Sequence, residues 1–237
     1  MADRSGVLDT LSRMLVPIHR DGHKFLATSL ALTLLAFLLW SLLGWLLLAI
    51  TALIAFFFRD PDRVTPLREG LVVAPADGEI VSIEKVAPPP ELAMDGGERV
   101  RISIYLSLLD VHVNRAPIAG RITRSVYVPG AFMNASLDKA SEDNERRALV
   151  IETPTGEEIA VVQIAGMLAR RIVTFAGEGD TVGIGQRYGL IRFGSRVDVY
   201  LPPSAAAHVC IGQRCTAGET VLADLTSREA ERVGRRG

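Results

Sequence analysis

The sequence predicts a mainly β protein of the α+β class: an N-terminal membrane helical hairpin followed by an antiparallel β sandwich or barrel-like domain. Residues 25–58 contain no charged side chain, whereas the rest of the chain has an ordinary soluble composition. After residue 59, turn residues separate short apolar runs at intervals of about 8–12 positions, which is typical of antiparallel sandwiches and barrels. We therefore expect an interfacial segment at 1–24, the hairpin at 25–58 and one domain at 59–237.

The apolar run of 34 residues is longer than the roughly 20 residues that one membrane-spanning helix needs. Trp40 and Trp45 flank Gly44 near its middle, so we expect two helices that turn near Gly44. Basic residues on both sides place both ends in the cytoplasm by the positive-inside rule; they are Arg13, Arg20, Lys24, Arg59, Arg63 and Arg68. A shallow re-entrant hairpin and a single tilted helix stay open, because the second arm is short.

The region before the hairpin carries Val7, Leu8, Leu11 and Leu15 at helical spacing. A helix with this apolar stripe either lies on the membrane surface or packs on the protein. The net charge of −1 excludes a general polyanion-binding field, so we expect no nucleic-acid partner.

The C-terminal domain divides into stretches of strands joined by turns that contain Gly or Pro. We expect strands in 70–86 with a turn at 76–78, in 99–130 with turns at Pro117 and Gly120, in 147–166 with a turn at 154–156, in 171–202, and a strand pair around 217–218. The polar stretch 134–147 predicts one helix, and the charged tail 226–237 is expected to fray.

Two segments, "APADGEIVSIE" and "VCIGQRCTAGETVLADL", resemble the two halves of a biotinyl or lipoyl barrel. The lysine that those carriers modify at a hairpin has no counterpart here, which disfavours a carrier function. The two cysteines, Cys210 and Cys215, are interpreted as strand residues, because too few further ligands lie nearby for a metal site.

A Gly-Ser pair, Gly194 and Ser195, interrupts the alternating apolar run "IRFGSRVDVYLP". Glycine inside a strand marks a bulge or a close backbone approach. It also removes steric hindrance beside a serine hydroxyl that attacks the preceding peptide bond. On its own the pair is weak support for such chemistry, because most Gly-Ser pairs lie in turns or bulges.

Several motifs in order resemble the phosphatidylserine decarboxylase family, in its short bacterial and archaeal form. They are "PADGEI", "YLSLLDVHVNRAPIAG", "YVPGAFMNASLDKASEDNER", "QIAGMLARRIV" and "FGSRVDVYLP", and the resemblance covers about residues 59–225. It implies self-cleavage between Gly194 and Ser195 into a 1–194 beta chain and a 195–237 alpha chain. The resemblance also implies that Ser195 becomes a covalent pyruvoyl cofactor.

The resemblance assigns roles to further residues. Ser195 is the nucleophile, His112 the base and Asp77 the carboxylate that orients it, as in a Ser-His-Asp arrangement. Longer members carry H-x-x-H, whereas this chain has Arg115 in the second place. It stays open whether His112 serves both self-cleavage and decarboxylation. Arg115, Arg170 and Arg171 are expected at the lipid phosphate, and Asn134 at the headgroup.

The implied reaction converts phosphatidylserine to phosphatidylethanolamine, with the pyruvoyl carbonyl as the electron sink. The expected partners are this lipid, the membrane and the two chains of one precursor, with a homo-oligomer left open. The expected location is the inner membrane of the cell, with the catalytic domain on the cytoplasmic face. Two alternatives are a non-enzymatic membrane-anchored adaptor and a decarboxylase of another serine lipid, such as archaetidylserine.

Overall fold

The computed structural model describes residues 16–94, 97–130, 144–166, 171–192 and 195–235. The chain divides into two compact units, residues 1–62 and 63–237, and each is described by itself. The expected amphipathic segment at 7–15 lies outside the described residues.

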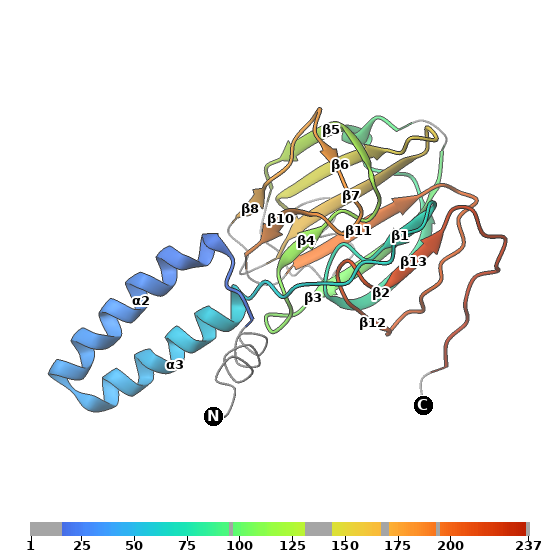
Figure 1. Ribbon diagram of the computed structural model, residues 1–237. Coiled ribbons are helices and arrows are strands. Elements are labelled where there is room, and N and C mark those ends of the chain that lie inside the picture. Colours follow the sequence, from blue (N-terminus) through green and yellow to red (C-terminus); the bar gives the residue numbers. More distant parts are fainter. Residues whose placement is uncertain (1–15, 95–96, 131–143, 167–170, 193–194, 236–237) are drawn as a thin grey trace, which may run out of the picture. The chain divides into compact units, whose positions relative to one another are not determined.

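The first unit is a pair of antiparallel helices, α2 (Arg20–Leu39) and α3 (Ser41–Phe57) (Figure 1). The helices separate at the extended residue Trp40, so the expected turn near Gly44 is wrong. Gly44 lies inside α3, where a Cβ atom would come within 2.3 Å of the Phe37 ring. Because Gly44 has no side chain, the two helices can approach each other closely, as small residues allow between membrane helices.

Hydroxyl groups join the two helices inside this apolar hairpin. The Oγ1 atom of Thr51 lies 2.7 Å from Ser29 Oγ and 3.1 Å from Thr33 Oγ1. Thr33 and Thr51 also donate to backbone carbonyls four residues earlier, at 2.8 and 2.9 Å. Each of these polar groups thus has a partner without water, as a hydrocarbon environment requires. Of the described helices, α2 is long and apolar enough to cross a membrane, and α3 with 17 residues is shorter.

The second unit is mainly antiparallel β, as the sequence predicts, and is built on one curled eight-stranded sheet (Figure 1). Its order is β12 (Arg214–Cys215), β2 (Gly78–Val86), β3 (Arg99–Leu106), β11 (Ser195–Leu201), β7 (Glu158–Ala165), β6 (Arg146–Glu152), β5 (Gly120–Val128) and β9 (Thr181–Val182). A second sheet contains β4 (Val113–Arg115), β10 (Arg187–Ile191) and β8 (Ile172–Thr174), and a third pairs β1 (Leu71–Val73) with β13 (Val221–Asp224). One short 3-10 helix, η1 (Pro90–Leu92), precedes β3.

Apolar residues cover both faces of the large sheet. The main core includes Ile104, Leu106, Val161, Ala165 and Val197, whose side chains share one face of β3, β7 and β11. A smaller cluster around Val162, Ile164 and Tyr200 covers the other face. Every residue of β11 is consequently buried, which is the expected condition of a central strand covered on both sides.

The expected hairpin with a turn at 154–156 is confirmed by β6 and β7. The expected strand pair around 217–218 is wrong in its pairing, because β12 joins β2 and β13 joins β1. The two barrel-like halves pack together at this point: Ala74 and Gly218 exchange backbone hydrogen bonds with the opposite half at 2.8 and 2.7 Å. These long-range hydrogen bonds pair backbone N–H and C=O groups that would pair within a local hairpin if one formed here.

The helix expected at 134–147 lies mostly outside the described residues, and its last two residues already belong to β6. The Gly-Ser pair does not interrupt one strand. Instead, β10 ends at Ile191 and Ser195 is the first residue of β11, while Gly194 lies outside the described residues. The charged tail has no helix or strand within its described part, residues 226–235.

Candidate active site

Ser195 is the first residue of the central strand β11, between Leu106 of β3 and Ala165 of β7. It is fully buried, and its Oγ atom has no hydrogen-bond partner among the described residues. An unsatisfied buried hydroxyl costs about 1–3 kcal/mol, a cost that the Ser82 and Tyr188 hydroxyls share among the described residues. A reactive hydroxyl at this position fits the role that the resemblance implies.

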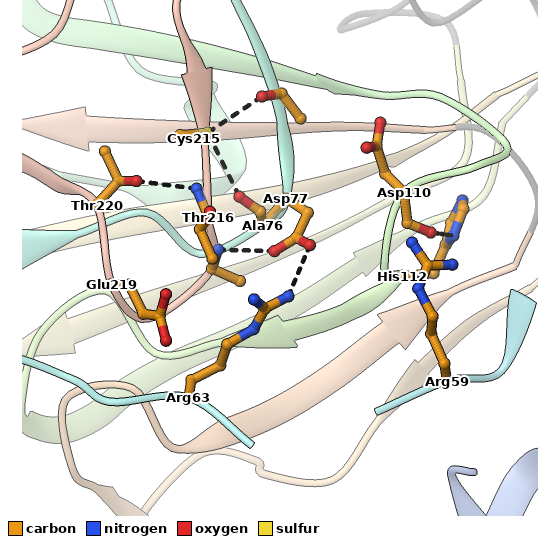
Figure 2. A network of polar contacts seen from close by, with 12 residues as sticks. Arg59, Arg63, Ala76, Asp77, Asp110, His112, Cys215, Thr216, Glu219 and Thr220 are labelled. Atoms are coloured by element: carbon orange, nitrogen blue, oxygen red, sulfur yellow. Dashed lines mark hydrogen bonds and ion pairs between the residues drawn. The ribbon is translucent and has the colours of Figure 1, made fainter. Parts of the chain in front are cut away.

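His112 lies just before β4 and is 2% exposed. Its Nδ1 atom is 2.9 Å from the carbonyl oxygen of Asp110 (Figure 2). A carbonyl oxygen only accepts, so Nδ1 carries the hydrogen, and the lone pair of the neutral ring is on Nε2. The arrangement therefore prepares Nε2 to act as a base.

Two backbone pairings hold His112 and Ser195 at the same end of the large sheet. The carbonyl of His112 accepts a hydrogen bond from the Ile191 amide at 3.2 Å, and Ile191 lies four residues before Ser195. Leu106, six residues before His112, is the β3 partner of Ser195. In sequence, β3 is followed by β4 and β10 by β11, and β3 pairs with β11 while β4 pairs with β10.

Asp77 occupies the turn before β2. One carboxylate oxygen accepts the Ala217 amide at 2.8 Å, and the other is 2.7 Å from an Arg63 guanidinium nitrogen (Figure 2). A Cβ atom on the next residue, Gly78, would lie 2.2 Å from the Tyr105 carbonyl, so this turn requires glycine to lie against β3. The Arg115 amide donates to the Pro75 carbonyl at 2.8 Å and so joins this turn to β4.

The structure thus brings Asp77, His112 and Ser195 to one end of the unit, and their catalytic roles remain predictions. Arg115 is 7% exposed and donates to the Gly185 carbonyl at 3.0 Å, which gives its guanidinium a structural contact. Arg171 is exposed beside Arg192, whose amide donates to its carbonyl at 3.2 Å. The predicted residues Asn134, Arg170 and Gly194 lie outside the described residues.

Sequence reasoning missed two groups beside the site, Arg63 and Asp110. Asp110 is 6% exposed, accepts from the amide and hydroxyl of Ser107 at 2.8 Å each, and pairs with Arg214. The S-x-x-D spacing of Ser107 and Asp110 is a local signal for such a turn. No local sequence pattern predicts that Arg63 lies at the site, because its partner Asp77 is 14 residues away.

Comparison with known proteins identifies the family. The family model described as phosphatidylserine decarboxylase matches residues 50–223. This chain belongs to the phosphatidylserine decarboxylase family. It is similar to the phosphatidylserine decarboxylase proenzyme of Cereibacter sphaeroides, with 55% identity over 96% of this chain and 98% of the relative. The proenzyme of the same name from Ruegeria pomeroyi is 57% identical over 89% of this chain and 96% of the relative.

Membership of the family confirms the resemblance seen in the sequence and the prediction of an enzyme, a phosphatidylserine decarboxylase. The adaptor hypothesis and the alternative serine lipid find no support in these relatives. Both relatives are named proenzymes, which implies two chains made from one precursor in those proteins. Among the described residues, no group of three or more His, Cys, Asp or Glu side chains is arranged to hold a metal ion.

Proposed function

We propose that the chain cleaves itself between Gly194 and Ser195 and that Ser195 becomes the pyruvoyl group of a membrane-bound phosphatidylserine decarboxylase. The observation that carries the proposal is the buried Ser195 hydroxyl without a hydrogen-bond partner among the described residues, at the first position of β11. The proenzyme names of the relatives are consistent with it.

In the proposed self-cleavage, Ser195 Oγ bonds to the carbonyl carbon of Gly194 while its proton passes to Nε2 of His112. The Gly194–Ser195 C–N bond then breaks, the Ser195 nitrogen takes up a proton, and an ester remains. Removal of the Ser195 Cα proton expels the carboxylate of Gly194. Reaction with water then releases ammonia and leaves a ketone at residue 195.

Asp77 contributes a negative charge at this end of the sheet and keeps its orientation through Arg63 and the Ala217 amide. We assign its charge to stabilise the protonated His112 ring, whereas the Asp110 carbonyl takes the Nδ1 hydrogen that a triad carboxylate would accept. The bound pyruvoyl group supplies a carbonyl that reacts with the substrate amine and accepts the electrons released with carbon dioxide.

We further propose that Arg170 and Arg171 bind the lipid phosphate, that Asn134 contacts the headgroup and that Arg115 supports this site. Guanidinium groups bind phosphate oxygens in pairs, and Arg171 is exposed next to the site. The apolar hairpin would hold the enzyme in the inner membrane with the catalytic unit on the cytoplasmic face, where this lipid is within reach.

Denaturing mass spectrometry of the purified protein tests self-cleavage. We expect fragments of residues 1–194 and 195–237, with the 43-residue fragment carrying a pyruvoyl group in place of its N-terminal serine. Ser195→Ala should remain one chain, whereas Ser204→Ala, which changes an exposed serine in the turn after β11, should cleave normally. An intact wild-type chain in membranes that decarboxylate the lipid would refute the proposal.

The role of His112 is tested by the rate of the same cleavage. A positioned general base accelerates proton transfer by about 10²–10⁴-fold, so His112→Ala should slow cleavage by this order. The measurement is the fraction of uncut chain against time after synthesis in vitro. Cleavage at the wild-type rate would remove His112 from the mechanism and leave the Ser195 test intact.

A further inference from the structure

The turn between β3 and His112 presents two leucines to solvent. We call residues 107–110 the tip turn. Within it, Leu108 is 45% exposed and Leu109 is 65% exposed. Single exposed leucines are common on proteins, but two adjacent ones at the end of a turn form a small apolar projection. This projection lies three residues before the candidate base.

Polar contacts hold the tip turn in place. The Asp110 carboxylate accepts both the amide and the hydroxyl of Ser107 and pairs with Arg214. Asp110 itself is 6% exposed. These contacts fix the conformation of the turn, so both leucines stay exposed. Apolar side chains lower their free energy by leaving water.

The charges around the tip turn differ from those at the other end of the sheet. Arg171 is exposed and Arg214 has a 62% exposed side chain at this end. The hairpin between β6 and β7, at the opposite end of β7 from Ala165, carries Glu152, Glu157 and Glu158, and the exposed Arg121 of β5 lies opposite Glu152. An exposed arginine beside two exposed leucines suits a surface of anionic lipid headgroups.

The chain also enters the second unit at the end of the sheet that carries the tip turn. Arg63, the first residue of this unit, pairs with Asp77 directly before β2, and Glu79 of β2 lies opposite Tyr105 near the end of β3. The uncharged run ends only five residues before Arg63. The entry of the chain, the candidate site and the tip turn therefore share one end of the sheet.

We propose that the tip turn inserts Leu108 and Leu109 into the headgroup region of the bilayer and so brings His112 to the level of the lipid substrate. A protein partner fits less well, because a stable protein interface buries at least about 1,000 Å² in total, far more than two side chains offer. The inference uses the lipid substrate of the family and holds whether or not the chain cleaves itself.

Tryptophan fluorescence in brominated lipid vesicles tests this contact. Trp40 and Trp45 are the only tryptophans, so Trp40→Phe and Trp45→Phe provide a silent full-length background. Leu109→Trp places the probe on the tip turn. Glu157→Trp is the matched control, at an exposed site about 25 Å away along β7. Each variant is reconstituted in phosphatidylserine-containing vesicles, with Ser195 and with Ser195→Ala.

We expect brominated acyl chains to quench the Leu109→Trp probe, most strongly when the bromine lies near the headgroup, because insertion reaches only about 5–10 Å. The Glu157→Trp probe should keep its fluorescence. The same result in the uncut Ser195→Ala chain would separate this proposal from self-cleavage. Equal quenching of both probes, or quenching of neither, would overturn it.

A second measurement covers the case in which tryptophan disturbs the turn. Leu108→Ser with Leu109→Ser should raise the apparent KM for phosphatidylserine in vesicles about tenfold, because both side chains lose their insertion energy. An unchanged KM would contradict the proposal.

Discussion

At the scale of single residues, the two cysteines differ in how deeply they are buried. Cys215 is 5% exposed, and its thiol lies 3.5 Å from the Ala76 carbonyl and 3.6 Å from that of Gly78. Burial, with a further contribution from the nearby Asp77 carboxylate, raises the pKa of the Cys215 thiol to about 12. Cys210 is partly exposed, with its thiol 3.4 Å from the Arg232 carbonyl.

We predict that iodoacetamide at pH 8 modifies Cys210 and leaves Cys215 intact. The thiolate is the reactive form, and at a pKa of about 12 only about 0.01% of Cys215 is thiolate at pH 8. Peptide mass spectrometry locates the label, and the protein denatured in urea should carry two labels. A Cys215 labelled as fast as Cys210 in the folded protein would contradict the burial argument.

At the scale of one element, β11 carries a buried ion pair directly after Ser195. Arg196 and Asp198 are 1% and 0% exposed, and their side chains meet at 2.6 and 3.1 Å. Arg196 also donates to the Ser103 hydroxyl of β3 at 2.8 Å. These residues lie on the face of β11 opposite to Ser195. They therefore stabilise the strand and do not contact the candidate site.

We predict that Asp198→Asn lowers the free energy of unfolding by about 3–5 kcal/mol, because it leaves the buried Arg196 charge without its counter-charge. A urea titration in detergent, performed in the Ser195→Ala chain, measures the change without the effects of cleavage. Arg196→Met with Asp198→Leu should recover part of the loss. Glu229→Gln, which removes an exposed partner of Arg232, should leave the titration unchanged.

At the scale of the whole molecule, the 34-residue uncharged run favours a location in the membrane. We predict that the chain stays with the membrane pellet during alkaline carbonate extraction. Leu34→Arg with Leu46→Arg places charges on exposed positions of α2 and α3, and each costs about 2.5–3.5 kcal/mol at the centre of a bilayer. This variant should be released.

The matched control for extraction is Leu67→Arg, at an 81% exposed position of the second unit. It should remain in the pellet with the wild-type chain. Release of the wild-type chain by carbonate would show that the apolar helices do not anchor it in the bilayer.

The sequence by itself determined the features that depend on neighbours along the chain. The turn at 154–156 lies between two alternating runs, and the apolar run at 25–58 forms two helices, because local turn residues and hydrophobic period act over a few positions. The ordered motifs around Asp77, His112 and Ser195 were sufficient to recognise the family, although they predicted no distances.

Only the tertiary structure decided what depends on residues far apart. Gly44 lies inside α3 against the Phe37 ring, and the break between the helices is at Trp40. The strands β12 and β13 pair with β2 and β1, more than 130 residues away, because burial of the core face favours distant partners over the local hairpin. The burial of the Ser195 hydroxyl likewise arises only when β11 lies between β3 and β7.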